Sequence, residues 1–171
     1  LMVPTMIGML LNSDTFDPAR LASLQYMTYG ASPMPEGLLT DLIERVPDLN
    51  IIQGYGQTEL APIVSTLQPE FHVLGGNNSK LRSAGRPVPG TEVKIVDEDG
   101  NKVAIGDVGE ICARGMGAMQ GYWKLEDQTT ATLVRAAASR LPWAYRYGLG
   151  APEPGSLFLS NTLLLPLWQK I

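Results

Sequence analysis

The sequence Asn50-Ile51-Ile52-Gln53-Gly54-Tyr55-Gly56-Gln57-Thr58-Glu59 changes character halfway along. Its first half is apolar and β-branched, which is typical of a strand covered on both faces. Gly54 and Gly56 then allow the backbone to turn and to approach a ligand closely. In open α/β sheets, ligands bind at the carboxyl ends of the strands. We therefore expect a buried strand that ends at a ligand site.

Three side chains of this stretch suit a nucleotide with a metal ion. The ring of Tyr55 offers a flat face for a base, the hydroxyl of Thr58 can donate to a phosphoryl oxygen, and the carboxylate of Glu59 is a hard ligand for Mg²⁺. The same residues also fit a plainer structure, made of a strand, a glycine turn and a solvated glutamate. The ten residues alone leave both interpretations open.

A second strand and loop precede this stretch. Gln25 to Tyr29 is predicted as a strand, and the small residues Gly30-Ala31-Ser32 that follow either leave room for a flat ligand or make a tight turn into a helix. Apolar residues at helical spacing run from Leu38 to Val46, and Pro47 ends that helix. Strand, helix, strand is the pattern of a parallel α/β sheet. We therefore expect adjacent or near-adjacent parallel strands whose loops form one half-site between Gly30 and Glu59.

The other segments give further elements. Apolar spacing predicts a helix over residues 3–11, and Asp17-Pro18 is typical of the start of a short helix that ends near Leu24. Residues 60–84 are predicted to be rich in loops. From Gly85 the apolar residues alternate, which predicts a hairpin closed by residues 97–100 and a strand from Val108 to Arg114. Tyr122 and Trp123 are expected as core or interface aromatics.

Composition is that of an ordinary globular protein of 171 residues, with 44% apolar residues and a net charge of −4, which gives no sign of nucleic-acid binding. The single cysteine, Cys112, excludes an internal disulfide and a cysteine zinc site, so we expect a reducing, cytoplasmic setting and a buried small apolar side chain. No apolar stretch reaches the length of a membrane span. His72, the only histidine, is expected at the surface. The oligomeric state is not readable from the sequence.

Three blocks, in the same order, resemble the adenylate-forming (AMP-binding) superfamily, which includes acyl-CoA synthetases, firefly luciferase and peptide-synthetase adenylation domains. Gln53 to Glu59 resembles its Gly-Tyr-Gly-x-Thr-Glu signature, Tyr29 to Pro35 resembles the small-residue loop before it, and Gly85 to Trp123 resembles the long block after it. The resemblance implies an α/β fold, with a parallel sheet and flanking helices in residues 1–80 and a small antiparallel β-barrel-like subdomain in residues 81–133.

The resemblance also implies a function, namely part of an ATP-dependent acyl-CoA synthetase similar to fatty-acid or aromatic-acid ligases. In that family a carboxylate attacks the α-phosphorus of ATP to give an acyl-adenylate and pyrophosphate, and coenzyme A then displaces AMP. Thr58 and Glu59 would be the catalytic residues, with Thr58 on the α-phosphate and Glu59 on Mg²⁺, while Tyr55 would stack on adenine. The implied nucleotide- and acyl-binding residues are Gly30, Ala31, Ser32, Gln53, Gly54, Tyr55, Gly56 and Thr58.

After Leu133 the resemblance ends, so residues 134–171 are expected to be a divergent tail of uncertain structure. The family's Thr-Gly-Asp motif for the ribose, its hinge, its catalytic Lys and its phosphate loop do not occur in the 171 residues, and the start at Leu1 inside a helix looks like a piece of something longer. We therefore expect a fragment that does not form acyl-adenylates alone. The alternative is a non-catalytic fragment that binds a nucleotide or another protein.

Overall fold

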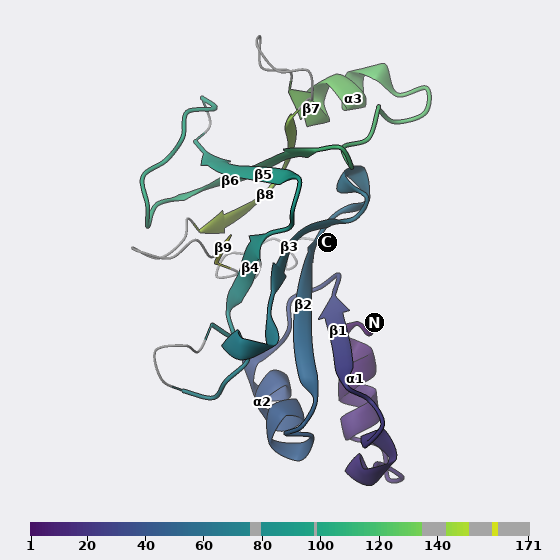
Figure 1. Cartoon of the computed structure of the whole chain (residues 1–171). Helices are drawn as coiled ribbons and strands as arrows, with labels where there is room; N and C mark the ends of the chain where they lie inside the picture. Colours follow the sequence, from purple (N-terminus) through teal and green to yellow (C-terminus); the bar gives the residue numbers. More distant parts are fainter. Residues whose placement is uncertain (76–79, 98, 135–142, 151–158, 161–171) are drawn as a thin grey trace.

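The computed structural model describes residues 1–75, 80–97, 99–134, 143–150 and 159–160, in two sheets with helices around them (Figure 1). The first sheet has five strands in the order β1-β2-β3-β4-β9 and the second has four in the order β5-β6-β8-β7. The strands of the first sheet are β1 (Tyr26–Gly30), β2 (Asn50–Gly56), β3 (Ile63–Leu67), β4 (Ser83–Pro87) and β9 (Leu159–Ser160). Those of the second are β5 (Thr91–Val96), β6 (Val108–Gly115), β7 (Leu133–Val134) and β8 (Trp143–Gly150).

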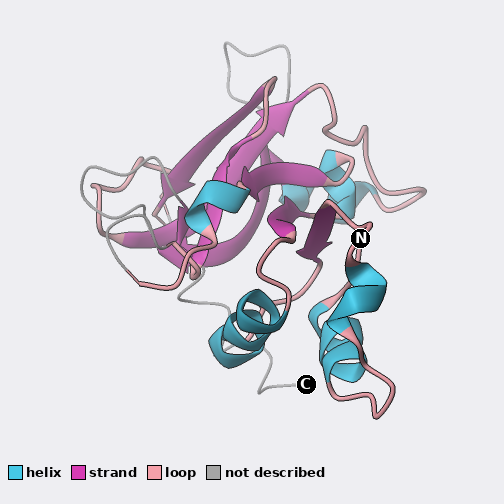
Figure 2. Ribbon diagram, turned by 60° about the horizontal axis from the view of Figure 1, so that its bottom comes forward, coloured by secondary structure: helices cyan, strands magenta, loops and turns pink. Residues whose placement is uncertain are grey.

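The helices gather at the two ends of the molecule (Figures 1 and 2). Helices α1 (Pro4–Leu11) and α2 (Glu36–Arg45) lie together beside the β1–β2 pair, and α3 (Glu126–Thr132) lies beside the second sheet. Short 3-10 helices cover Pro18–Leu21, Thr58–Leu60 and Pro69–Phe71. The longest described helix, α2, has ten residues, and no helix within the described ranges has the length and hydropathy needed to cross a membrane.

Strands β1 and β2 are parallel neighbours, paired from Tyr26 with Asn50 to Gly30 with Gly54. This confirms the predicted strand–helix–strand unit, in which α2 is the crossover and ends at Arg45, before Pro47. The rest of the first sheet differs from the prediction, because β3 runs antiparallel to β2 and β4 runs antiparallel to β3. The sheet is therefore mixed, and only its β1–β2 pair is parallel.

The prediction that residues 60–84 are mainly loop was wrong for β3. Its sequence, Ile63 to Leu67, is rich in β-branched residues, and Val64, Ser65 and Leu67 are buried. Pro62 precedes this run and Pro69 follows it, so the strand has only five residues. A strand this short, with a serine and a threonine inside it, has too little alternation to stand out from a loop.

The main core lies between α1, α2 and the β1–β2 pair. Its buried members recur at helical spacing in the helices and alternate in the strands, and they are Ile7, Leu11, Met27, Tyr29, Leu39, Leu42, Val46, Leu49 and Ile51. Fully burying a side chain of this size contributes about 1.5–3 kcal/mol relative to leaving it exposed. This packing holds the two parallel strands, and therefore their carboxyl ends, at a fixed separation.

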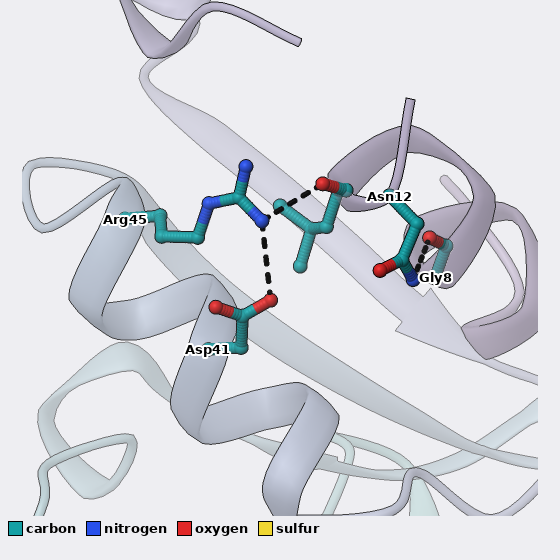
Figure 3. A network of polar contacts seen from close by, with 5 residues as sticks. Gly8, Asn12, Asp41 and Arg45 are labelled. Carbon is teal, nitrogen blue, oxygen red and sulfur yellow. Dashed lines mark hydrogen bonds and ion pairs between the residues drawn. The ribbon is translucent and has the colours of Figure 1, made fainter. Parts of the chain in front are cut away.

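Arg45 fastens α1 to α2 (Figure 3). Its Nη1 donates to the Leu11 carbonyl at 2.8 Å and to Asp41 Oδ2 at 3.4 Å, and its guanidinium lies over the Phe16 ring, 4.2 Å from the centroid. Asn12 Nδ2 donates to the Gly8 carbonyl at 2.8 Å. The last carbonyls of a helix have no partners within the helix, so Arg45 supplies one at Leu11. The Asn12 side chain adds a second donor to the Gly8 carbonyl, which already accepts from the Asn12 amide.

The second sheet is antiparallel, as predicted. Strand β5 pairs with β6 from Thr91 with Gly115 to Val96 with Glu110, and the turn after β5 is held by Asp97 Oδ1, which accepts from the Asp99 and Asn101 amides at 3.0 and 2.8 Å. The described strands form an open sheet, so a closed barrel is not confirmed. Cys112 is fully buried in β6, which confirms its predicted place as a small apolar residue.

The predicted tail contributes strands to both sheets. Strand β8 pairs with β6, starting from Val108 with Gly150, and β9 pairs with β4. Within the predicted tail, Trp143 to Gly150 therefore continues the antiparallel ladder of the second sheet. The apolar run of residues 163–168 lies outside the described residues.

Candidate functional site

The two predicted ligand loops leave the first sheet at the same edge. Strands β1 and β2 run in the same direction and end with the Gly30–Gly54 pair, so residues 31–32 and residues 55–59 start from neighbouring positions. We call residues 30–32 and 53–59 the glycine corner. It brings together all the residues that the sequence analysis assigned to nucleotide, acyl group and metal.

The glycines of the corner have a packing role of their own. A Cβ on Gly30 would lie 2.3 Å from the Gly54 carbonyl oxygen, and a Cβ on Gly56 would lie 1.8 Å from the Pro62 carbonyl oxygen. Both contacts are with backbone, which cannot move aside cheaply. Glycine is therefore required at both positions so that neighbouring strands can approach, before any ligand is considered.

Two residues in or next to the corner hold left-handed backbone conformations without being glycine. Ala31 has φ +68° and follows β1, and Ala61 has φ +51° and ends the 3-10 helix after Thr58. An L-residue in this region costs about 1–2 kcal/mol. Unfavourable conformations of this kind are concentrated at ligand sites, where the surrounding structure holds them in place. The location of Ala31 within the corner and of Ala61 just after it agrees with a functional interpretation of these loops.

Tyr55 joins the two sheets. Its half-buried ring packs against Ala84, Ile95 and Ile111 on one side and against Leu60 and Val64 on another. Burial raises the pKa of the Tyr55 phenol to about 12, so the hydroxyl stays neutral at physiological pH. The cavity between this ring and β6 has a volume of only about 10 Å³, room for at most one water molecule. A stacked base would therefore have to use the outward side of the ring, and adenine stacking stays a prediction.

Gln53, the buried end of the corner, belongs to a buried polar cluster. The Tyr29 hydroxyl lies 3.3 Å from Gln53 Oε1 and 3.2 Å from His72 Nε2, and His72 Nδ1 lies 3.0 Å from the Gln68 carbonyl oxygen. A carbonyl only accepts, so Nδ1 carries the ring proton and Nε2 is an acceptor in the neutral ring. The single Tyr29 proton is then shared between two acceptors. This cluster fixes the side chain of Gln53, which is 5% exposed.

The prediction that His72 is a surface residue was wrong, because it is only 6% exposed. Burial lowers the pKa of its imidazole, and the bond to Gln68 and the charge of Glu70 only partly oppose this. The Tyr29 ring meets the His72 ring edge-on at 5.7 Å. The apolar residues that follow it give no sign of this burial, since Val73 and Leu74 are themselves 38% and 43% exposed.

Thr58 and Glu59 form the outer end of the corner, on the 3-10 helix Thr58–Leu60 that follows β2. Thr58 is exposed, and Glu59 is half-buried. The Tyr122 hydroxyl donates to Glu59 Oε1 at 2.5 Å, and the Met119 amide donates to the Glu59 carbonyl at 2.8 Å. Sequence reasoning missed this connection, because 63 positions separate Tyr122 from Glu59.

Trp123 was expected in a core or an interface, and within this chain it is 85% exposed. It lies in the turn that follows Tyr122, where the Leu125 amide donates to the Tyr122 carbonyl at 3.3 Å. The Tyr122 side chain reaches Glu59, while the Trp123 ring lies in solvent. The periodicity of two neighbouring aromatics does not show which one turns inward.

The corner offers a single carboxylate to a metal ion. No group of three or more His, Cys, Asp or Glu side chains gathers anywhere in the described parts of the chain. Mg²⁺ in nucleotide sites is usually bound through one or two carboxylates together with phosphates of the substrate. The donor set therefore fits an ion that is held mainly by a nucleotide, and it does not fit a site built by the protein alone.

An α/β unit whose parallel strands end in glycine loops carrying a hydroxyl and a carboxylate is typical of nucleotide-binding proteins. A sequence model described as AMP-binding enzyme matches residues 1–123 of the chain. The chain therefore belongs to the AMP-binding enzyme family.

Curated relatives include fatty-acid ligases and an acyl-CoA synthetase. The chain is 37% identical to a fatty acid–[acyl-carrier-protein] ligase, ScoC of Streptomyces coeruleorubidus, over 77% of this chain and 25% of that protein. It is 36% identical to acyl-CoA synthetase 7 of Caenorhabditis elegans, over 77% of this chain and 23% of that protein. It is 35% identical to a long-chain-fatty-acid–CoA ligase of Salmonella typhimurium, over 74% of this chain and 21% of that protein. The chain thus spans a quarter or less of the length of these relatives.

Solved structures match a larger share of this chain than the curated relatives do. The crystal structure of VinN has a TM-score of 0.76 and 29% identity, covering 93% of this chain and 38% of that chain. PA1221, described as a peptide-synthetase (NRPS) protein containing adenylation and PCP domains, has a TM-score of 0.74 and 27% identity, covering 92% of this chain and 31% of that chain.

Proposed function

We propose that this chain supplies one side of the active site of an ATP-dependent acyl ligase that adenylates a carboxylic acid and passes the acyl group to a thiol. The observation that carries the proposal is the Gly30–Gly54 pair, which brings the two family motifs to one edge of the sheet. The fatty-acid ligases among the relatives favour a fatty acid as the substrate. Their names also favour coenzyme A or an acyl carrier protein as the thiol.

In the proposed reaction, an oxygen of the substrate carboxylate forms a bond to the α-phosphorus of ATP, and the bond from that phosphorus to the pyrophosphate oxygen breaks. The thiol then attacks the acyl carbon of the adenylate, and AMP leaves. Such steps depend mainly on positioning and on electrostatic stabilisation of the phosphoryl oxygens. When bound, Mg²⁺ supplies charge neutralisation at the phosphates.

Most residues of the glycine corner have a proposed part. The exposed Thr58 hydroxyl donates to an α-phosphate oxygen, and the Glu59 carboxylate contributes an oxygen to the metal ion. Gly30, Ala31 and Ser32 border the adenine and the acyl group, with Gly54 as the floor of the acyl pocket. The outward side of Tyr55 stacks on the base. Gln53 is fixed beneath them by Tyr29 and His72.

We further propose that the 171 residues alone bind a nucleotide weakly and do not form acyl-adenylates at a useful rate. Towards the phosphates the corner offers one hydroxyl and one carboxylate, and it carries no cationic side chain of its own. Loss of a single preorganised donor in an active site already lowers rates by about 100- to 1000-fold. Such effects do not add simply, but the remaining stabilisation is small.

The test measures ATP binding to the chain by titration calorimetry, with Mg²⁺ and with EDTA, together with ATP–pyrophosphate exchange over fatty acids of several lengths. Glu59→Gln should weaken binding only when Mg²⁺ is present. Glu44→Gln is the matched control, because Glu44 is exposed on α2, away from the corner. A chain that binds no Mg·ATP, or a Glu59→Gln variant that behaves like Glu44→Gln, contradicts the proposal. Robust exchange contradicts the statement about the isolated chain.

A further inference from the structure

Tyr122 is the one side chain outside the glycine corner that the described structure joins to the Glu59 carboxylate. Its hydroxyl donates to Oε1, while no described residue donates a hydrogen bond to Oε2. The two oxygens therefore have different surroundings. One accepts from a protein donor, and the other has no donor among the described residues.

The backbone of Glu59 is fixed by the same loop that carries Tyr122. The Met119 amide donates to the Glu59 carbonyl, and a Cβ on Gly117 would lie only 2.8 Å from the Leu60 carbonyl oxygen. The loop of residues 116–122 therefore lies directly against the 3-10 helix that carries Glu59. Tyr122 adds the side-chain contact to this main-chain contact, so both the position and the orientation of Glu59 are determined.

Tyr122 itself is held by α3. Its amide donates to Thr129 Oγ1 at 2.9 Å, and the Thr129 hydroxyl donates to the Leu125 carbonyl at 2.9 Å. Gly121, the residue before Tyr122, has φ +156°, and a Cβ there would lie 2.8 Å from Thr129 Cγ2. A continuous set of contacts thus runs from α3 through Thr129 and Tyr122 to the Glu59 carboxylate.

We propose that Tyr122 is a positioning residue for Glu59: it orients the carboxylate so that Oε2 faces the cation that accompanies the nucleotide. The proposal rests on the proposed function, because it assumes that Glu59 contacts that cation. A glutamate side chain loses considerable rotamer freedom when it is fixed, and a side chain that is already fixed before binding avoids that loss. We expect the orientation to strengthen Mg²⁺-dependent nucleotide binding by about tenfold.

The test compares Tyr122→Phe, which removes only the hydroxyl, with the control Tyr26→Phe, where the tyrosine is exposed at the start of β1. ATP affinity is measured on the full chain with Mg²⁺ and with EDTA. Tyr122→Phe should lose about tenfold in affinity with Mg²⁺ and nothing with EDTA, because only the metal-dependent part uses the oriented carboxylate. Tyr26→Phe should match the unmodified chain in both conditions.

Two further variants separate positioning from general damage. Thr129→Val keeps the Tyr122 hydroxyl and should give a smaller loss of the same Mg²⁺-dependent part. The double variant Glu59→Gln, Tyr122→Phe should bind no more weakly than Glu59→Gln alone, because the hydroxyl acts through the carboxylate. If Tyr122→Phe proves unstable in urea unfolding, Thr129→Val alone decides the question.

The outcomes distinguish the two proposals. A Glu59→Gln variant without any Mg²⁺-dependent effect overturns the metal role of Glu59 and therefore the proposed function. A clear Glu59→Gln effect together with unchanged affinity in Tyr122→Phe and Thr129→Val overturns only the positioning role. Equal losses with Mg²⁺ and with EDTA also overturn it, because they indicate a structural role for the tyrosine.

Discussion

Replacing Gly30 by alanine should destabilise the fold by about 2–3 kcal/mol, because the new methyl group would meet the backbone of the neighbouring strand. The added Cβ would lie 2.3 Å from the Gly54 carbonyl oxygen and 3.2 Å from its carbonyl carbon. Carbon and oxygen atoms in close but tolerable contact are about 3.3–3.6 Å apart. The ends of β1 and β2 would therefore have to separate by roughly 1 Å.

The expected loss of stability combines two destabilising contributions and one contribution that opposes them. Forcing extra atoms into a packed site costs about 1–3 kcal/mol, and each hydrogen bond weakened by the separation costs about 0.5–1.5 kcal/mol. Alanine also restricts the unfolded chain, which returns about 0.4–1 kcal/mol. The Gly30–Gly54 pair is the last of the β1–β2 register, so the damage should be confined to the end of the pair.

The assay is urea unfolding followed by circular dichroism, with Gly37→Ala as the matched control. Gly37 lies near the start of α2, and a Cβ there would have no atom within 4 Å. Alanine is the better helix former, so this variant should gain up to about 1 kcal/mol. If Gly30→Ala unfolds within 0.5 kcal/mol of the unmodified chain, the packing explanation is wrong, and the missing side chain at Gly30 must serve a ligand instead.

Three further predictions concern His72, Arg45 and Trp123. Burial lowers the folded-state pKa of His72, so as pH falls below about 6.5 the unfolded chain takes up a proton first. The free energy of unfolding should therefore be highest above that pH and decrease below it, by at most about 1.4 kcal/mol per pH unit, until the folded-state pKa is reached. The variant His72→Gln should not show this decrease when urea unfolding at pH 7.5 and at pH 5.5 is compared. Arg45→Ala should lower the unfolding free energy by about 1–2 kcal/mol, since it removes the donor to the Leu11 carbonyl and the contact with Phe16; an unchanged urea midpoint would contradict this. Trp123→Ser should change stability by less than about 0.5 kcal/mol, because the ring is exposed, and a larger loss would show that the ring is covered in solution.

The strand–helix–strand unit was predictable because its signals are local. The helical spacing from Leu38 to Val46, the stop at Pro47 and the β-branched run before Gly54 each follow from a few neighbouring residues. Together they also fixed the direction of β1 and β2, since a short helical crossover joins parallel strands. The corner followed from this direction, as parallel neighbours end at one edge.

What could not be predicted depends on contacts between distant residues. Nothing near His72 states that Tyr29 will lie beside it, and nothing near Glu59 points to Tyr122. The packing role of Gly30 was also hidden, because the atom that excludes a side chain belongs to Gly54 on another strand. A sequence shows that a glycine permits a close approach, but it does not show whether a ligand or a neighbouring strand makes that approach.

The close pairing of β1 with β2 also has a consequence for the order of folding. Partners in this pair, such as Tyr29 and Gln53, are only 24 positions apart, whereas β6 and β8 join Val108 to Gly150. Closing a shorter loop loses less chain entropy, and segments rich in local contacts form earlier. We expect the segment from Tyr26 to Gly56 to gain amide protection before β8 in pulse-labelled hydrogen exchange during refolding. Earlier protection in β8 would contradict this order. The glycine corner would then exist before the second sheet is complete, and β8 would be added to β6 only afterwards.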